Sequence, residues 1–525
     1  MHNCMKNLIS RLTSNKRTMQ ILLGFLAILA VRCVQPAPQG ELWRPPSGEQ
    51  DEAPIPITDA TQMPAQIHPT VYYLPTRDPE IPVETPTPNV ERVLPTARVE
   101  ATTYTMQAGD TLAIVSNKFN VPVDMILAAN DLPNPDIIPV GQVLNIPGRK
   151  VGPPGSDFKI IPDSELVYGP YSSTLDIFSF IQSEGGFLSK YREKIGDTYY
   201  SGAEIVQRVS QEFSVNPRIL LAVLEYQSGW LTNAYAVDEE YPMGLEDKYR
   251  KGLYLQLSWA ANAMNRGYYL WQREWIAHFS LTDKSLVPIS GTLNAGTVGV
   301  QYLMSDLYDR AGWDSAVSET GVFAVYEKLF GFPFDYAIDD LILENLASPE
   351  FQLPFEKGDV WYHTGGPHAG WGTGSAWAAI DFAPKTEENC AVSEEWVTAA
   401  IDGQVLRSGD GVVVIDTDGD GLEQTGWTLL YLHIATEGRV PAGAMVKRGD
   451  RIGHASCEGG VSNGTHVHLA RRYNGQWIWA AGSVPFILDG WVVQSSGSEY
   501  NGYLERGAEI VEAWDRAIDE NRITR

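Results

Sequence analysis

The sequence predicts a multidomain α+β protein with a small βααβ module, a mostly helical domain and an antiparallel β domain, in that order. Three observations predict this architecture. The chain has 525 residues, enough for several domains. Apolar residues recur at spacings of three and four across residues 160–345, which is typical of helices. Residues 350–490 instead carry short β-like runs separated by Gly, Asp and Pro turns.

The charge balance excludes one broad class of function. Lysine and arginine number 39 against 65 aspartates and glutamates, which gives a formal net charge of −26. Such an acidic surface repels polyphosphate, and no basic stripe gathers the positive charges. We therefore expect no nucleic-acid partner. The oligomeric state stays open.

Residues 1–33 predict an export signal. Four basic residues precede an apolar run from Met19 to Val31, about 13 residues long, which is shorter than the ~20 residues of a membrane-spanning helix. The segment is therefore a signal peptide or an uncleaved, tilted anchor, and we expect membrane contact only through it. Cys33 follows Arg32 where bacterial lipoprotein signals have a small residue, so lipidation is the less favoured alternative.

Residues 34–100 predict an extended linker. They hold 14 of the 33 prolines and few regular apolar periods. A spacer of this kind lifts the following domains away from the membrane, toward a target such as a cell wall.

Residues 101–148 predict a strand over residues 103–106, two short helices and a closing strand, with Thr111 as an N-cap. Gly109 to Leu112, Asn130 and residues 140–147 resemble a LysM module. The resemblance implies binding of glycans that contain N-acetylglucosamine. The residues placed near the sugar are Gly109, Asp110, Thr111, Asn130 and Ile138. For Asp110 and Thr111, helix capping is an equal alternative.

Residues 160–345 predict helices, for example over residues 203–213, 217–227 and 254–269. Residues 215–230 and 294–297 resemble the lysozyme and lytic transglycosylase superfamily, in which a glutamate acts as general acid. Gln227 stands at that position, and Glu225 lies two residues earlier, about 200° around the helix. A glycan-binding or vestigial domain is our first interpretation. A glycosidase that uses Glu225 is the second, and a structural spacer is the third.

Residues 350–490 predict an antiparallel β domain, in which the histidines of the chain are concentrated. The tail over residues 491–525 is predicted as a helical extension, with one amphipathic helix from Glu505 to Asn521. Six of the nine histidines fall within residues 360–470. In a strand, His466 and His468 share one face. Three protein ligands with one open position suit catalytic zinc, and His368, Asp381 and His468 supply such a set.

These histidine motifs resemble the lysostaphin-type zinc endopeptidases, whose pattern is His and Asp, then Tyr-x-His, then His-x-His. The corresponding stretches are residues 365–368, 380–384, 400–405, 431–433, 446–453 and 466–468. The resemblance implies that His368, Asp381 and His468 bind Zn²⁺. It also implies that His433 and His466 orient the nucleophilic water and stabilise the oxyanion.

One departure from the family pattern keeps a second ligand in consideration. Twelve residues separate His368 from Asp381, where the family places them four apart, and a Gly-rich insertion over residues 369–375 fills the gap. His363 is therefore a rival for the first ligand position, although we favour His368. For His454 we prefer a structural role.

Two further motifs each allow a structural and a functional interpretation. Cys390 and Cys457 are the two cysteines beyond the targeting region, and we expect one disulfide rather than part of a zinc site, which lacks C-x-x-C spacing. Residues 416–421 begin like a calcium loop, but position twelve is Trp427 instead of glutamate. We favour a solvated acidic turn over calcium.

Together these observations predict an exported enzyme of a bacterial cell envelope, a zinc endopeptidase that cleaves the peptide cross-links of peptidoglycan. Its partners are then the glycan strands, through the LysM module, and the stem peptides. The alternatives are a non-catalytic envelope scaffold that regulates other wall hydrolases, and a glycosidase in the helical domain.

Overall fold

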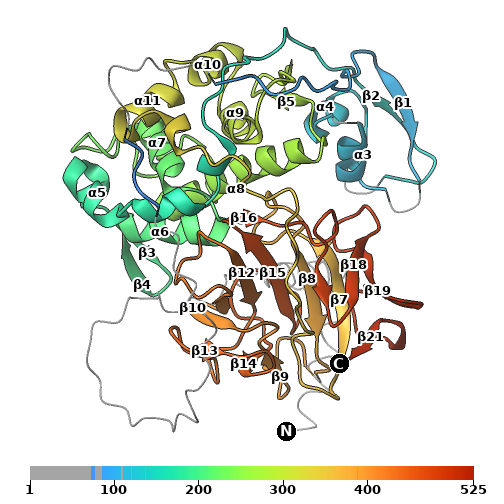
Figure 1. The fold of residues 1–525 in the computed structure, drawn as a ribbon. Coiled ribbons are helices and arrows are strands. Elements are labelled where there is room, and N and C mark those ends of the chain that lie inside the picture. The colour runs from blue at the N-terminus through green and yellow to red at the C-terminus, as the bar shows by residue number, and fades with distance from the viewer. Residues whose placement is uncertain (1–71, 77–85, 108–109, 120, 136–137, 387) are drawn as a thin grey trace, which may run out of the picture.

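The computed structural model describes residues 72–76, 86–107, 110–119, 121–135, 138–386 and 388–525 (Figure 1). The predicted signal or anchor over residues 1–33, most of the predicted linker and Gly109 lie outside the described residues. The described part combines a small α/β module, a helical region and antiparallel sheets, which confirms the predicted fold class (Figure 1). None of its helices combines the length and the apolar character that a membrane span requires.

The small module has the predicted βααβ order. Strand β1 pairs with β2 in antiparallel register, so that Thr102 lies opposite Ile146. Two short helices cross between them and enclose a core that includes Val115, Ile126 and Leu144. The bounds are β1 Thr102–Thr105, α3 Leu112–Phe119, α4 Val123–Ala128 and β2 Val143–Ile146.

Part of the predicted linker packs against the helical region instead of extending away from it. The Asn89 and Arg92 amides donate to the carbonyls of Thr292 and Gly291, at 3.1 Å each. The Arg92 guanidinium also lies over the Trp271 ring, 4.6 Å from its centroid. The expectation of a free spacer over residues 34–100 is therefore wrong for this stretch, because its side chains find partners on the domain surface.

The helical region is held by well-capped helices around one core. Ser201 and Glu204 form a capping box at the start of α6, and Pro217 opens α7. Helices α8 and α9 approach closely at Gly267, where any side chain would collide with the backbone of α9. The helices are α5 Ile177–Glu184, α6 Gly202–Phe213, α7 Pro217–Ser228, α8 Leu253–Gln272, α9 Ala295–Leu307, α10 Arg310–Ala316 and α11 Val322–Phe330.

Short elements connect these helices. Two hairpins, β3 with β4 and β5 with β6, lie at the edges of the region. Their bounds are β3 Arg192–Ile195, β4 Thr198–Ser201, β5 His278–Ser280 and β6 Leu286–Pro288. The 3-10 helices are η1 Asp163–Glu165, η2 Pro170–Thr174, η3 Phe187–Ser189 and η4 Pro333–Tyr336.

The C-terminal half is built on a nine-stranded antiparallel sheet. Its strand order is β13-β10-β11-β12-β15-β8-β7-β21, and β16 pairs with β15. The strands of this sheet are β7 Val360–His368, β8 Ala379–Ala383, β10 Gly403–Gly409, β11 Val412–Asp416, β12 Trp427–Leu432, β13 Met445–Val446, β15 Val467–Tyr473, β16 Gln476–Trp477 and β21 Arg522–Thr524. Two smaller sheets pair β9 Trp396–Thr398 with β14 Arg451–His454, and order β17 Ile487–Leu488, β18 Trp491–Ser495, β19 Gly502–Arg506 and β20 Glu509–Glu512.

The central strands of the large sheet are buried on both faces. Val413, Ile415 and Leu429 pack into the core of the sheet domain. Val414 and Leu430, which alternate with them, pack into the core of the helical region. Figure 1 shows the helices above the ends of β12, β15 and β16. The helical region therefore covers one face of the sheet.

Polar contacts tie the two parts together at this junction. The Trp477 indole N–H donates to the Phe213 carbonyl at 3.2 Å, and the Trp477 amide donates to the Tyr269 hydroxyl at 2.9 Å. Arg472 of the sheet domain is buried, donates to the Ser214 hydroxyl of the helical region at 3.3 Å, and is balanced by Glu423 of its own domain at 2.8 Å. Buried polar groups with this many partners define one relative placement of the two parts.

The C-terminal tail is not the predicted helical extension. Residues 491–525 contain strands β18 to β21 and one 3-10 helix, η5 Asp519–Asn521. Gly507 has a φ of +63° and turns the chain between β19 and β20, and Leu504 and Val511 pair in register facing the core. The apolar residues of the tail fit both a helical and a hairpin spacing, and the glycine turn decides for the hairpin.

Candidate metal centre

Three adjacent strands bring His368, Asp381 and His468 together. His468 on β15 lies directly opposite Asp381 on β8, and His368 ends the neighbouring strand β7. One ligand atom from each residue falls within 4.8 Å of the others. His368 Nε2 and His468 Nδ1 are 2.9 Å apart, and each lies 3.3 Å from Asp381 Oδ1. This arrangement could hold a metal ion.

Backbone carbonyls fix the orientation of both imidazoles. His368 Nδ1 lies 2.9 Å from the Gly366 carbonyl, and His468 Nε2 lies 3.1 Å from the Gly370 carbonyl. A nitrogen that faces a carbonyl must carry a proton, so the other nitrogen of each ring is the one directed at the shared centre, where it can bind a metal once it is deprotonated. Metal-binding histidines are typically oriented in this way.

Asp381 is buried, and its Oδ1 accepts no hydrogen bond from any described residue. A buried carboxylate oxygen without a donor is costly, and a cation would relieve that cost. Burial works against its ionisation, but the neighbouring His368 and His466 outweigh burial and hold the Asp381 pKa well below its usual value. Gly365 makes room for this carboxylate, since a Cβ there would lie 2.4 Å from Oδ2. The donor set and the unmet acceptor fit a metal ion.

His433 and His466 form a second pair beside this group, with ring centroids 4.4 Å apart. The Nδ1 atoms of these rings lie 3.0 Å from the Glu458 carbonyl and 2.7 Å from the Gly464 carbonyl. His466 Nε2 is 3.9 Å from Asp381 Oδ1. Burial, with smaller effects of His466 and His468, lowers the His433 pKa to about 3, so this ring is neutral.

His363, the rival first ligand, lies outside this group. Its Nδ1 faces the Val511 carbonyl at 3.3 Å, and its ring packs against Phe382. Burial lowers the His363 pKa to about 4. His454, for which we prefer a structural role, stacks on Trp396 and faces the Glu395 carbonyl at 3.1 Å.

The Gly-rich insertion leaves the sheet and returns to it. It docks on the helical region, where the Gly374 amide donates to Asn262 Oδ1 at 2.8 Å. A Cβ at Gly374 would collide with the Asn262 carbonyl, so glycine is needed for this close approach. The long spacing between His368 and Asp381 is thus compatible with both residues at one centre.

Sequence analysis did not find Tyr500, which lies in the turn between β18 and β19. Its ring stacks on His368, with centroids 4.3 Å apart and planes 18° apart. Burial, with the nearby Asp381 and Glu499 carboxylates, raises the Tyr500 pKa to about 12. A lone tyrosine in a tail that the sequence predicts to be helical gives no sign of a site residue. The hairpin of β18 and β19 brings it to His368.

Cys390 and Cys457 form the expected disulfide, with Cα atoms 5.2 Å apart. The bridge joins the segment after β8 to the loop that leads into His466. Ser462 in that loop donates to the Gly464 carbonyl, which is the same carbonyl that faces His466 Nδ1. The disulfide therefore restrains the loop that orients His466.

The acidic loop after β11 also gathers carboxylates. Oxygen atoms of Asp416, Asp418 and Asp420 lie within 4.8 Å of one another and could hold a cation. The Asp416 carboxylate accepts the amides of Asp418, Gly419 and Gly421, as in an acidic turn. Asp416 is fully buried, whereas Asp418 and Asp420 are partly exposed and the two glycines of the turn are exposed, so the turn is solvated except at its first carboxylate.

The LysM candidates have internal partners. Asp110 Oδ2 accepts from the Tyr104 hydroxyl and the Gln107 amide, at 2.7 Å each. Thr111 accepts the Ile114 amide at 3.2 Å and so caps α3. Asn130 bridges Ile126 and Asn145, whereas Ile138 packs against the small core. Capping is therefore real for Thr111, and sugar contact by these residues stays a prediction.

Glu225 holds the chain after α7. Its carboxylate accepts the Leu231 amide at 2.9 Å, the Thr232 amide at 3.3 Å and the Thr232 hydroxyl. Gln227 Oε1 accepts the Tyr308 hydroxyl at 2.8 Å. Both side chains are engaged in packing the helical region, and this geometry adds no support for a glycosidase acid.

Comparison with known families divides the chain in three. Residues 104–147 match the LysM domain, residues 159–341 match the N-terminal domain of LasA, and residues 376–479 match peptidase family M23. The helical region thus matches a family other than the lysozymes that its sequence resembles.

Individual relatives agree with this division. Protease LasA of Pseudomonas aeruginosa (strain UCBPP-PA14) is 25% identical over 345 residues, which are 61% of this chain and 75% of that protein. Beta-lytic metalloendopeptidase of Achromobacter lyticus is 27% identical over 163 residues, 30% of this chain and 41% of that protein. Among solved structures, the M23 metalloprotease pseudoalterin from the deep sea aligns with 34% of this chain and all of its own, at 24% identity and a TM-score of 0.28. The chain contains a LysM domain, a LasA N-terminal domain and a peptidase M23 domain, and it is homologous to LasA and to the M23, or lysostaphin-type, metallopeptidases.

Proposed function

We propose that the protein is an exported, zinc-dependent endopeptidase that cleaves the peptide cross-links of peptidoglycan. The M23 and LysM matches point to a peptidase that acts on peptidoglycan. The observation that carries the proposal is the buried Asp381 Oδ1, to which none of the described residues donates and which lies 3.3 Å from an imidazole nitrogen of both His368 and His468. Carboxylate and imidazole ligands in this number suit catalytic zinc.

His368, Asp381 and His468 are the proposed ligands. A zinc ion held there supplies a Lewis acid that lowers the pKa of water and polarises a carbonyl oxygen. The chain contributes the orientation of the ligands, through the carbonyls of Gly366 and Gly370. Removing the hydrogen-bond partner of a metal-binding histidine typically lowers metal affinity or activity about 10- to 100-fold.

His433 and His466 are the proposed proton carriers. His433 is held neutral, with its proton on Nδ1, so its Nε2 can accept a proton from attacking water. His466 faces the same centre, with Nε2 3.9 Å from Asp381 Oδ1, and its proposed role is to stabilise the developing oxyanion. The two roles share one narrow site, since the rings are in contact.

The LysM module is the proposed anchor on the glycan strands. Binding to N-acetylglucosamine there would hold the peptidase near an insoluble substrate and so raise its effective concentration. Export follows from the signal-like residues 1–33 and is supported by the cell-wall association of LysM domains. The domain boundaries 101–148, 160–345 and 350–490 are proposed as in the sequence analysis, and the three family matches fall within or beside them.

Digestion of purified peptidoglycan tests the proposal. The full mature chain and His466→Ala are compared by counting new amino groups and new reducing ends. We expect new amino groups from the wild-type chain, and their loss in the variant and with a chelator. His278→Ala, which changes a histidine of the helical region, is the control and should retain activity.

The other outcomes decide for the alternatives. Reducing ends without amino groups would place catalysis in the helical region and overturn the proposal. Neither product, from a protein that contains no zinc, would support a non-catalytic scaffold that regulates other wall hydrolases.

A further inference from the structure

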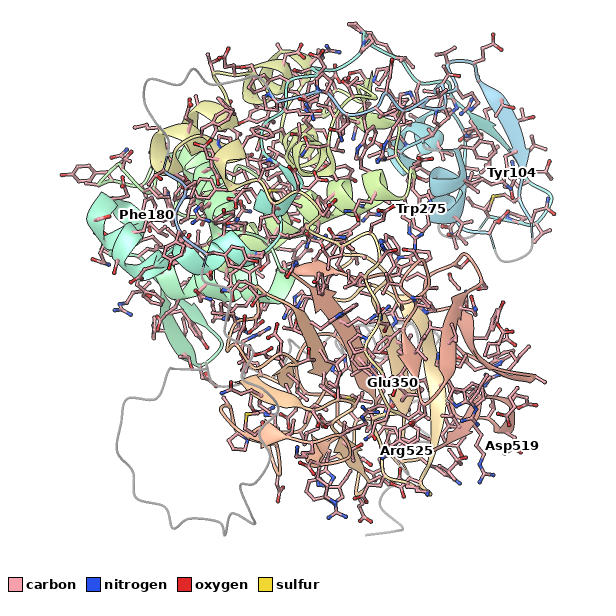
Figure 2. All side chains as sticks on the ribbon, in the orientation of Figure 1. Tyr104, Phe180, Trp275, Glu350, Asp519 and Arg525 are labelled. Carbon is pink, nitrogen blue, oxygen red and sulfur yellow. A yellow bond between two sulfur atoms is a disulfide. The ribbon has the colours of Figure 1, made fainter. Side chains whose placement is uncertain are left out.

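The turn between β18 and β19 contacts the first proposed metal ligand. This turn spans residues 496–501 in the C-terminal tail, outside the residues 376–479 that match peptidase family M23. Figure 2 labels Arg525 of the same tail on the side of the sheet domain away from the helices. Tyr500 of the turn instead lies at the metal group, where its ring stacks on His368 with centroids 4.3 Å apart. The tail therefore reaches the centre through this turn.

Backbone hydrogen bonds hold the turn against the carbonyl that orients His368. The Gly366 amide donates to the Tyr500 carbonyl at 2.8 Å, and the Tyr500 amide donates to the Pro367 carbonyl at 3.1 Å. Between these two bonds along the chain lies the Gly366 carbonyl, which faces His368 Nδ1 at 2.9 Å. Because the chain is held on both sides of this carbonyl, the turn fixes the acceptor that orients the ligand.

Two glycines allow the turn to lie this close to the ligand segment. A Cβ at Gly366 would lie 2.7 Å from the Gly502 amide nitrogen, and a Cβ at Gly502 would lie 2.7 Å from Cδ of Pro367. On the other side of the ligand, the Ala369 amide donates to Glu499 Oε1 at 3.2 Å. The turn thus holds the chain both before and after the proposed ligand.

The backbone of Tyr500 has a conformation that favours glycine. Its φ is +65°, in the left-handed region, where a bulky side chain is strained. The side chain is 54% exposed, so burial in the core does not explain a tyrosine at this position. Strained residues of this kind persist where their surroundings require them, and they cluster at functional sites. Glycine would serve the turn as well, so the ring itself indicates a role at His368, with which its plane makes an angle of 18°.

We propose that Tyr500 is a positioning residue of the metal centre, which fixes the plane of the His368 imidazole so that Nε2 faces Asp381 and His468. The hydrogen bond to the Gly366 carbonyl fixes the direction of Nδ1 but leaves the ring free to rotate about that bond. A stacked phenol ring removes this freedom, because rotation would drive one ring into the other. The inference rests on the proposed function in that the centre binds zinc, and it does not depend on the bond that is cleaved.

A ligand that is held in this way loses little conformational freedom when it binds a metal ion, because its orientation is fixed beforehand. Removing the ring of Tyr500 would leave His368 to be ordered by the ion itself. Loss of a group that orients a metal-binding histidine typically lowers metal affinity about 10- to 100-fold. The fold should tolerate the loss, since Tyr500 is half-exposed and glycine suits its backbone. Metal affinity should therefore change more than stability.

The test uses the full mature chain, freed of metal and titrated with Zn²⁺ against a competing chelator. The same proteins are loaded with Co²⁺, whose visible absorption spectrum reports the arrangement of its ligands. Tyr500→Gly removes the ring and keeps both backbone hydrogen bonds of the turn. We expect this variant to raise the dissociation constant for Zn²⁺ about tenfold and to change the Co²⁺ spectrum. Tyr500→Phe keeps the stacked ring and should restore wild-type values of both.

Asp340→Gly is the matched control. Asp340 is exposed, has a φ of +59°, and precedes Leu341, whose carbonyl accepts Asn474 at the far end of β15 from His468. This variant should bind both metals as the wild type does.

Four outcomes separate this inference from the proposed function. Wild-type affinity and spectrum in Tyr500→Gly would overturn the inference and leave the peptidase untouched. A loss in Tyr500→Phe equal to that in Tyr500→Gly would assign the effect to the hydroxyl group and overturn stacking as its cause. A wild-type chain that binds neither metal would overturn the inference together with the zinc centre. A selective loss of affinity in Tyr500→Gly, with no amino groups released by the wild type, would retain the positioning role and reject the endopeptidase.

Discussion

Two carboxylates, one in each half of the molecule, are candidate site residues from the sequence, Glu225 as a glycosidase acid and Asp381 as a zinc ligand, and they have opposite surroundings. Glu225 in the helical region accepts three hydrogen bonds from the segment that follows its helix. Asp381 in the sheet domain is more deeply buried, and its Oδ1 accepts none from the described residues. A carboxylate whose hydrogen bonds are made by its neighbours has a structural role, whereas a buried carboxylate oxygen without a donor indicates a ligand. The hydrogen bonds therefore distinguish Glu225 from Asp381, although the sequence makes both candidates.

Removing the Asp381 carboxylate should have the largest effect. Asp381→Asn takes away a charge and a proposed ligand, and a metal contributes several kcal/mol to such hydrolysis, so release of amino groups should fall about 1000-fold or more. Zinc content per chain is measured in parallel and should fall with it. Asp515→Asn, on the exposed tail, is the control. Full activity of Asp381→Asn would remove the contrast with Glu225.

Loss of the disulfide should weaken the sheet domain next. The bridge closes a span of 67 residues, and chain entropy predicts a cost of about 4 kcal/mol when both cysteines become serine. Urea unfolding of the double variant measures this cost, and hydrogen exchange should assign it to the sheet domain. Reductant should destabilise only the wild-type chain. Equal stability of the two proteins would contradict the expectation.

Acid should destabilise the sheet domain, because its His363 is fully buried and burial lowers the His363 pKa to about 4. Above pH 6.5 this residue is neutral in both the folded and the unfolded state. As the pH falls from 6.5 to 4, the unfolded chain binds a proton that the folded one does not, so the free energy of unfolding should fall by about 3 kcal/mol.

Unfolding of metal-free protein at several pH values measures this loss. His363→Phe should show a shallower fall across the same range, whatever its stability at neutral pH. Parallel profiles for the two proteins would mean that other groups cause the decline.

The smallest effect is expected at Glu225. Glu225→Gln keeps an acceptor but loses the charge, and because the site is partly exposed we expect a loss of about 1 kcal/mol in stability. Release of both amino groups and reducing ends should be unchanged. A selective loss of reducing ends in this variant would restore the glycosidase interpretation and reverse the comparison.

Local patterns carried much of the prediction. The period of two in His466-Val467-His468 places both rings on one face, and the βααβ order of the LysM segment follows from its turn and cap residues. The disulfide followed from a count of cysteines. In the first two cases neighbours in sequence decide the structure, and the disulfide needed only that two cysteines remain to pair.

Long-range packing explains what the sequence left undecided or misassigned. Whether His363 or His368 lies at the metal group depends on how the insertion folds. Tyr500 reaches His368 only because of the turn between β18 and β19. The tail spacing fitted a helix as well as a hairpin, and Gly507 settled it in three dimensions.

The sheet face beneath the helical region also bears the metal group. Leu432 and Ala470 pack toward the helices, and His468, which lies opposite Leu432 and two residues before Ala470 on β15, shares their face and belongs to the centre. The helices therefore cover strands that position the proposed ligands. Excising them would expose the apolar side chains that these strands now bury, so we expect the sheet domain of this chain to be less stable alone than with its helical cover.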